Sequence, residues 1–232
     1  REVTSKNAYT LKVSGFKGGH SGVEIDKGRR NAIKALAEGI AIVPDASIVS
    51  MAGGNADNAI PRSAECTFIT DSDISSVDFE GELKALFGDI ENEMAVTLER
   101  CEGDFLGLDR SSSAKAISLI RECPSGVIRM MADIEGLVET SLNLGILSMS
   151  DDTVEISFSV RSAVGSEKEK LAEKLQEIAT EHGADFGRYG EYPAWEYRKD
   201  SHLRDTMCQV YRDMYGREPV VMTIHAGLEC GI

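Results

Sequence analysis

The chain has 232 residues, a formal net charge of −14, and 42% hydrophobic and 28% charged residues. This is the composition of an ordinary soluble globular protein, and no run approaches the roughly 18 consecutive apolar residues that a membrane-spanning helix needs. We therefore expect no membrane partner. The acidic balance also excludes nucleic acid as a partner, because a surface that binds phosphates has to be basic.

The five cysteines are odd in number and contain no Cys-x-x-Cys pair. This pattern argues against a disulfide framework and against a thiolate zinc site, and it favours reduced thiols in a cytoplasmic protein. The cysteines are Cys66, Cys101, Cys123, Cys208 and Cys230.

The two ends of the sequence indicate a piece of a longer protein. The chain opens with Arg1-Glu2-Val3-Thr4, without an initiator Met or a signal peptide, and it stops at Gly231-Ile232 without a visible terminating element. We therefore expect both termini to be cut points and the chain to be a fragment.

The first half of the chain predicts one strand and then a helix, two strands, a helix and a strand. Apolar and polar residues alternate over 9–13, which is typical of a half-buried strand. Helical spacing of apolar residues and the breaker Pro44 bound the next helix. The five later elements are expected at residues 27–42, 48–51, 64–70, 79–94 and 96–100.

The second half predicts the same order of elements again. A capping box at Ser166-Glu167-Lys168-Glu169 is expected to open its second helix, and Gly183 to close that helix. The repetition is one of element order and not of residues. The repeated elements are expected at residues 114–122, 138–147, 153–162, 166–182 and 184–189.

Helices gathered against antiparallel strands predict a two-layer α+β sandwich with one sheet face covered and the other exposed. From about residue 191 the character changes. A helix with Leu203, Met207, Val210 and Met214 on one face is followed by a fully apolar stretch, 220–224, which we expect to be a strand buried on both faces. That strand needs partners that the rest of the chain does not obviously supply. We therefore divide the chain into a domain at 1–190 and an incomplete α/β segment at 191–232.

One histidine stands within a glycine-rich turn that follows the first strand. The stretch Gly15-Phe16-Lys17-Gly18-Gly19-His20-Ser21-Gly22 leaves the backbone free to turn sharply and to approach a ligand closely. His20 is either a functional residue or a hydrogen-bonded turn residue. Ser21 is a poor candidate for a nucleophile, because Gly22 stands one position too early for the Gly-x-Ser-x-Gly elbow.

Two further side chains suit the binding of a carboxylate. Arg161 shares one face of its expected strand with Glu155, so it is either a bidentate carboxylate ligand or an exposed partner of Glu155 or of solvent. Asn58 follows Gly53-Gly54 and precedes Ile60-Pro61. Its amide can both donate and accept, although an asparagine at this place is also a common turn residue.

His225 and Glu229 lie just beyond the expected apolar strand, where α/β sheets place their ligand-binding loops. Their spacing suits a metal site on a helix, but Gly227 disfavours a helix there.

Four stretches taken together, in their order along the chain, resemble one enzyme family. They are the turn around His20, Gly53-Gly54-Asn55-Ala56-Asp57-Asn58-Ala59-Ile60-Pro61, Ser159-Val160-Arg161, and His225-Ala226-Gly227-Leu228-Glu229-Cys230-Gly231. The resemblance is to the bacterial aminoacyl-histidine dipeptidases, which belong to the carnosinase and aminoacylase group of two-zinc hydrolases. It covers nearly the whole chain, but only the lid and a small part of the catalytic domain of such an enzyme.

The resemblance implies a doubled lid domain and a role for each candidate residue. His20 would polarise the scissile carbonyl and stabilise the oxyanion, Arg161 would bind the C-terminal carboxylate of the substrate, and Asn58 would contact the substrate. His225 and Glu229 would line the substrate side of the catalytic domain.

The same resemblance implies two zinc ions that this chain does not bind. The metal-ligand set of the group includes a His-x-Asp pair and adjacent glutamates, and this sequence contains neither. We therefore expect the ligands in the missing catalytic half, the substrate to be a small dipeptide such as Xaa-His, and the fragment alone to be inactive. A homodimer is a further possibility. The alternative is a stand-alone α+β binding or dimerisation module without chemistry, because fold alone cannot separate the two.

Overall fold

The computed structural model describes residues 3–151, 153–194 and 196–225. Its main feature is a seven-stranded sheet in which every pair of neighbours is antiparallel. The order is β6-β1-β5-β3-β8, and both β7 and β9 also pair with β8. The strands are β1 (Val3–Ser14), β3 (Ser47–Gly53), β5 (Ala64–Ile69), β6 (Ala95–Gly107), β7 (Gly126–Met130), β8 (Val138–Ser150) and β9 (Thr153–Ser162).

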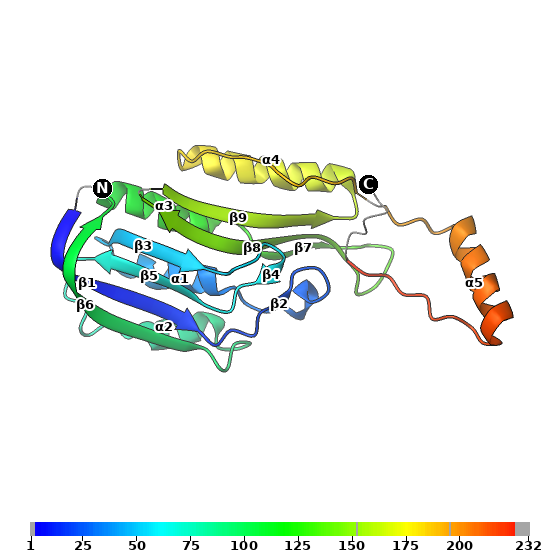
Figure 1. Cartoon of the computed structure of the whole chain (residues 1–232), viewed down its shortest axis with the longest axis horizontal. Coiled ribbons are helices and arrows are strands. Elements are labelled where there is room, and N and C mark those ends of the chain that lie inside the picture. The colour runs from blue at the N-terminus through cyan, green and yellow to red at the C-terminus, as the bar shows by residue number, and fades with distance from the viewer. Residues whose placement is uncertain (1–2, 152, 195, 226–232) are drawn as a thin grey trace.

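Four helices form the second layer, so the α+β sandwich expected from the sequence is confirmed. Figure 1 shows α1, α2 and α3 behind the sheet and α4 along its β9 side. Their bounds are α1 (Ala32–Ala41), α2 (Phe79–Phe87), α3 (Arg110–Glu122) and α4 (Gly165–Glu181). The largest core cluster joins α1, α2 and α3 to β1, β3 and β5, and a second one joins α4 to β8 and β9.

Helix α1 shows why the core forms here. Asn31 caps it by accepting from the backbone N–H of Ile33 at 2.9 Å, and the same side chain donates to the carbonyl of Leu144 on β8 at 2.7 Å. Leu36 and Ile40 are almost completely buried. The helix begins later than the expected residue 27, because Gly28 adopts a left-handed φ of 66° and separates it from a short 3₁₀ turn, Ile25–Lys27.

The internal repeat is incomplete in the structure. Residues 184–189 do not form the strand expected to close the second copy, and β7, which the sequence pattern did not indicate, pairs with β8 instead. Helix α4 also begins at Gly165, and its N-cap Val164 makes no side-chain capping bond, so the prediction of a capping box at Ser166 was wrong. Gly183 does end α4, with a left-handed φ of 67°.

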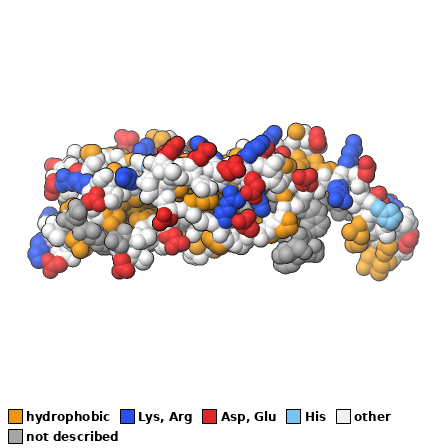
Figure 2. Space-filling model, turned by 90° about the horizontal axis from the view of Figure 1, so that it is seen from above, with side chains coloured by type: hydrophobic (Ala, Val, Ile, Leu, Met, Phe, Trp, Pro, Cys, Tyr) orange, Lys and Arg blue, Asp and Glu red, His pale blue; other side chains and the backbone are white. Residues whose placement is uncertain are grey.

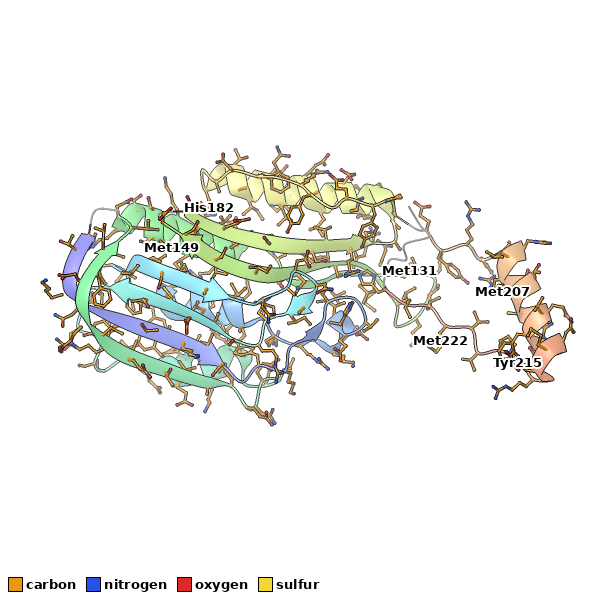
Figure 3. The ribbon with its side chains drawn as sticks, viewed as in Figure 1. Met131, Met149, His182, Met207, Tyr215 and Met222 are labelled. Atoms are coloured by element: carbon orange, nitrogen blue, oxygen red, sulfur yellow. The ribbon has the colours of Figure 1, made fainter. Side chains whose placement is uncertain are left out.

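The C-terminal part of the described chain leaves the sandwich. Helix α5 (His202–Tyr215) buries none of its residues and stands apart from the sheet. We call residues 196–225 the arm. Figure 3 shows Met207, Tyr215 and Met222 on this arm, away from the two layers. Residues 217–224 form no strand, so the strand expected at 220–224 is absent from the described chain. The physical reason is that no neighbouring strand lies beside it, and a single strand has no partner for its backbone.

A small two-stranded sheet, β2 (Gly19–His20) with β4 (Ala59–Ile60), lies against β8 around Asn143. No helix in the part of the chain that the structure describes has both the length and the apolar character needed to cross a bilayer.

Candidate functional site

The small sheet joins the two motifs that the sequence analysis singled out. His20 lies opposite Ala59 in the β2–β4 pair, and the backbone N–H of Ser21 donates to the carbonyl of Asn58 at 2.9 Å. The turn around His20 and the loop around Asn58 therefore form one unit, although they are far apart in the sequence.

This unit rests on β8 through backbone contact and one buried side chain. Asn143, 2% exposed, donates to the carbonyls of Asp57 at 2.7 Å and Ala59 at 2.9 Å. A Cβ placed on Gly145 would lie 2.5 Å from the Cα of Asp57, and one placed on Gly54 would lie 1.9 Å from the carbonyl oxygen of Gly145. The two glycines therefore allow the loop to lie directly on the strand.

Arg161 reaches the same region from β9. It lies opposite Ser141 in the β8–β9 pair, on the face of the sheet that carries Asn143 and Ser159. Arg161 is partly buried, its Nε has no hydrogen-bond partner, and among the described residues it forms no ion pair with Glu155. A buried guanidinium nitrogen without an acceptor is suited to an anionic ligand.

His225 arrives at this site from the end of the arm. Its Nε2 lies 2.7 Å from Oγ of Ser141, and its carbonyl oxygen would be 2.8 Å from a Cβ on Gly22. Burial first, and then the positive charge of Arg161, lower the pKa of His225 to about 4. A hydrogen bond with the backbone of Val138 and the carboxylate of Asp26 act in the opposite direction on that pKa.

The ring of His20 is held in one orientation. Its Nδ1 accepts from the backbone N–H groups of Gly22 at 2.9 Å and Val23 at 3.4 Å. A neutral imidazole whose Nδ1 accepts must carry its proton on Nε2. His20 is exposed, so this Nε2–H group is available to a ligand.

The structure thus brings four sequence-predicted site residues, His20, Asn58, Arg161 and His225, to one end of the sheet. Asn58 and Arg161 also line a cleft of about 440 Å³ that extends between β9, α4 and the segment 184–194. Glu229 lies outside the described residues. Ser21 is 1% exposed and its Oγ has no partner, which agrees with its rejection as a nucleophile.

The other described histidines, His182 and His202, lie outside this site, whereas Cys123 lines the cleft. His182 ends α4, where its Nε2 lies 2.7 Å from a carboxylate oxygen of Glu122, and Figure 3 shows it at the opposite end of the sandwich from the arm. His202 is the first residue of α5. The four cysteines within the described ranges, Cys66, Cys101, Cys123 and Cys208, are unpaired.

The sequence analysis missed several residues that build the site. Ser141 and Asn143 stand in the stretch 138–144 of β8, which is buried along its whole length. Polar residues inside such a buried run are a usable signal, because each needs a partner. Glu24 and Arg29 follow His20 closely in the sequence, and their role emerges only from contacts with the turn.

Comparison with known proteins finds similarity to peptidases. Residues 11–97 match the family described as "Peptidase dimerisation domain". The chain is 34% identical over 233 residues to the cytosol non-specific dipeptidase of Escherichia coli (strain K12), and this match covers 97% of the chain and 48% of that protein.

A solved structure is similar over the same extent. The aminoacylhistidine dipeptidase from Vibrio alginolyticus superposes with a TM-score of 0.83 at 33% identity, covering 97% of this chain and 48% of that one. The chain therefore spans about half the length of the dipeptidases to which it is homologous.

Proposed function

We propose, from the homology of this chain to the aminoacylhistidine dipeptidases, that it forms the lid and substrate-binding region of a zinc-dependent dipeptidase for Xaa-His and similar dipeptides. The observation that carries the proposal is the convergence of His20, Asn58 and Arg161 at one end of the sheet, where Arg161 has no acidic partner among the described residues.

The three side chains divide the recognition of a dipeptide among them. Arg161 binds the C-terminal carboxylate in bidentate fashion, because a planar guanidinium matches both oxygens. Asn58 lines the same cleft and supplies an amide that can donate to the carboxylate or accept from the peptide N–H. His20 points its Nε2–H at the scissile carbonyl, where it stabilises the negative charge that develops on the oxygen.

The described residues of this chain offer no site for the metal ions of the proposed enzyme. Within residues 3–151, 153–194 and 196–225, no group of three or more His, Cys, Asp or Glu side chains is placed to hold a metal ion. The two zinc ions that we propose for the enzyme would therefore be bound by residues outside this sequence, together with the group that activates water. This chain's contribution is to bind and orient the substrate.

The division into a lid at 1–190 and a return segment at 191–232 is part of the same proposal. Helix α5 carries exposed apolar side chains on its free surface, among them Leu203, Met207 and Met214. Figure 2 shows hydrophobic side chains on this protruding arm. In the proposed enzyme this face packs on the catalytic half, and His225 and Glu229 contribute to substrate binding.

We also propose a cellular location and an oligomeric state for the enzyme from its similarity to known proteins. A cytoplasmic enzyme agrees with the name of the Escherichia coli relative and with the unpaired cysteines. A homodimer is proposed from the match of residues 11–97 to a dimerisation domain. The same match favours the second candidate function, a dimerisation module without activity.

Replacing Arg161 with Met in the complete enzyme tests the proposal. The loss of a charge-assisted bidentate contact, worth about 1.5–3 kcal/mol, should lower kcat/KM on the order of tenfold to a hundredfold for a free dipeptide. The loss should largely vanish for a dipeptide whose C-terminus is amidated, because that substrate has no carboxylate for either the wild-type enzyme or the variant to bind.

A matched control is Arg100→Met. Arg100 also stands on a strand, but it donates to Asn7 and lies on β6, at the opposite edge of the sheet from β9. Equal losses on the free and amidated substrates would show that Arg161 is structural. An unchanged kcat/KM for R161M, or no hydrolysis by the wild-type enzyme, would contradict the proposed role of Arg161. The dimerisation module would then be the better function, and sedimentation of the chain would measure its oligomeric state.

A further inference from the structure

One carboxylate stands directly behind the turn that carries His20. Oε2 of Glu24 accepts from the backbone N–H of His20 at 2.9 Å, and Oε1 accepts from Arg29 at 2.7 Å and from Lys27 at 3.0 Å. The backbone N–H of His20, then Lys27 and Arg29, lower the pKa of Glu24 to about 2, while partial burial acts in the opposite direction. Glu24 is therefore ionised throughout the neutral range.

Arg29 connects this carboxylate to the other side of the turn. Its second terminal nitrogen donates to the carbonyl of Gly18, two residues before His20. The Glu24–Arg29 pair thus holds the backbone both before and at His20.

The position of Gly19 shows how closely the pair packs against the turn. A Cβ on Gly19 would lie 2.1 Å from a guanidinium nitrogen of Arg29 and 2.6 Å from Oε2 of Glu24, and its φ is 140°. Only a glycine at position 19 therefore leaves room for the Glu24–Arg29 pair against the turn.

The shape of this backbone turn determines the tautomer of the His20 ring. Nδ1 of His20 accepts from Gly22 and Val23 only because the backbone after His20 curls back over the ring. If these two N–H groups moved away, nothing else among the described contacts of His20 would keep the proton on Nε2.

We propose that Glu24, held by Arg29, is a positioning residue that keeps His20 in the tautomer whose Nε2–H group faces the substrate. The consequence for catalysis rests on the proposed function, whereas the consequence for the ring does not.

Long-range ¹H–¹⁵N NMR of the ¹⁵N-histidine-labelled chain tests the ring directly, because it distinguishes a protonated from an unprotonated ring nitrogen. The signals of His20 are assigned by their loss in His20→Asn. We expect an unprotonated Nδ1 in the wild type at neutral pH and a mixture of tautomers in Glu24→Ala. Glu24→Gln, which keeps an acceptor for the His20 N–H but loses the charge that binds Arg29, should lie between the two.

Kinetics in the complete enzyme provide the second measurement. A group displaced by about 1 Å can cost on the order of a hundredfold in rate, so kcat should fall about 10- to 100-fold in Glu24→Ala while KM stays within about threefold. Glu80→Ala is the matched control, because Glu80 also pairs with a lysine, Lys84 at 2.6 Å, but lies on α2 away from the turn.

The two measurements separate the possible failures. An Nδ1 that stays unprotonated in both Glu24 variants would overturn the inference, whichever variant folds better. A shifted tautomer without any loss of kcat would support the positioning of the ring and overturn the proposed catalytic role of His20 instead. Equal losses in E24A and E80A would show that the rate depends on general surface charge and would also overturn the inference.

Discussion

Helices α1 and α5 have similar sequence features but differ completely in burial. Each has a side-chain N-cap, Asn31 in α1 and Ser201 in α5, and each has apolar residues along one face. Helix α1 buries that face in the largest core cluster, between the sheet and helices α2 and α3, whereas α5 buries none of its residues in the described chain. A helical period therefore shows that a helix needs a packing partner, but it does not show which segment provides it.

The same contrast holds between the sandwich and the whole arm. Among the described residues of the arm, His225 contacts the sandwich: its ring reaches Ser141, it forms a hydrogen bond with the backbone of Val138, and its carbonyl lies against Gly22 in the turn. Local stability follows the number of buried apolar contacts. The arm should therefore open far more readily than the sheet.

The largest expected difference comes from removing one apolar side chain in each helix. Leu36→Ala should lower the free energy of unfolding by about 2–5 kcal/mol, because Leu36 is completely buried and its loss leaves a cavity. Met207→Ala, at a site 64% exposed, should change it by no more than about 0.5 kcal/mol in this chain. Urea unfolding of the two variants measures both values. A comparable loss in M207A would mean that α5 packs on the sandwich.

A smaller effect is expected where the loop of Asn58 lies on β8. Gly145→Ala places a Cβ against the backbone of Asp57, and such overpacking costs about 1–3 kcal/mol. Gly187→Ala is the control, since a Cβ there meets nothing within 4 Å. Thermal unfolding of the two variants compares them, and a Tm of G145A equal to that of G187A would show that the loop can lift from the strand at no cost.

The smallest effect concerns the attachment of the arm. The pKa of His225 is lowered to about 4 from an ordinary 6.5, so the unfolded state binds the proton more tightly. The contribution of His225 to the free energy of unfolding is fully present above about pH 6.5 and is lost as the pH falls towards 4. One pKa unit corresponds to about 1.4 kcal/mol, and partial solvent access reduces the total to about 1–2 kcal/mol.

Amide hydrogen exchange of Gly22 and Ser141 at pH 7 and pH 5, corrected for the intrinsic pH dependence of exchange, measures this loss. Protection should fall at pH 5 in the wild type and stay nearly constant with pH in His225→Gln. A pH dependence that persists in H225Q would assign the effect to other groups.

The sequence was sufficient for the two layers and for most elements within them, because alternation and helical spacing report directly which residues are buried. It failed where the environment outweighs the local pattern. Strand β6 extends to Gly107, beyond the expected residue 100, because the long strand β1 pairs with it. Residues 101–107 gave no strand signal, since they include two acidic residues and two glycines and do not alternate. Residues 184–189 and 220–224 have strand-like composition, but neither segment is paired with a strand.

For the site, the residue types and their motifs were visible, but the supports were not. Glycine-rich turns marked His20 and Asn58, and the strand pattern placed Arg161 on the polar face. The contact of Glu24 with the backbone of His20 and the contact of Ser141 with His225 depend on how the chain folds back, and no period in the sequence encodes them.

The close contact between Gly54 and Gly145 has a consequence for how a ligand would enter. Asn58 is attached to β8 through this backbone contact, and Arg161 is attached to the same strand through the pairing of β9. The two side chains therefore move as one rigid body with the sheet, whatever the arm does. A motion of the arm around His225 would change the entrance to the site and leave the spacing between Asn58 and Arg161 the same, so the rate of ligand entry and the selection of ligand length can vary independently.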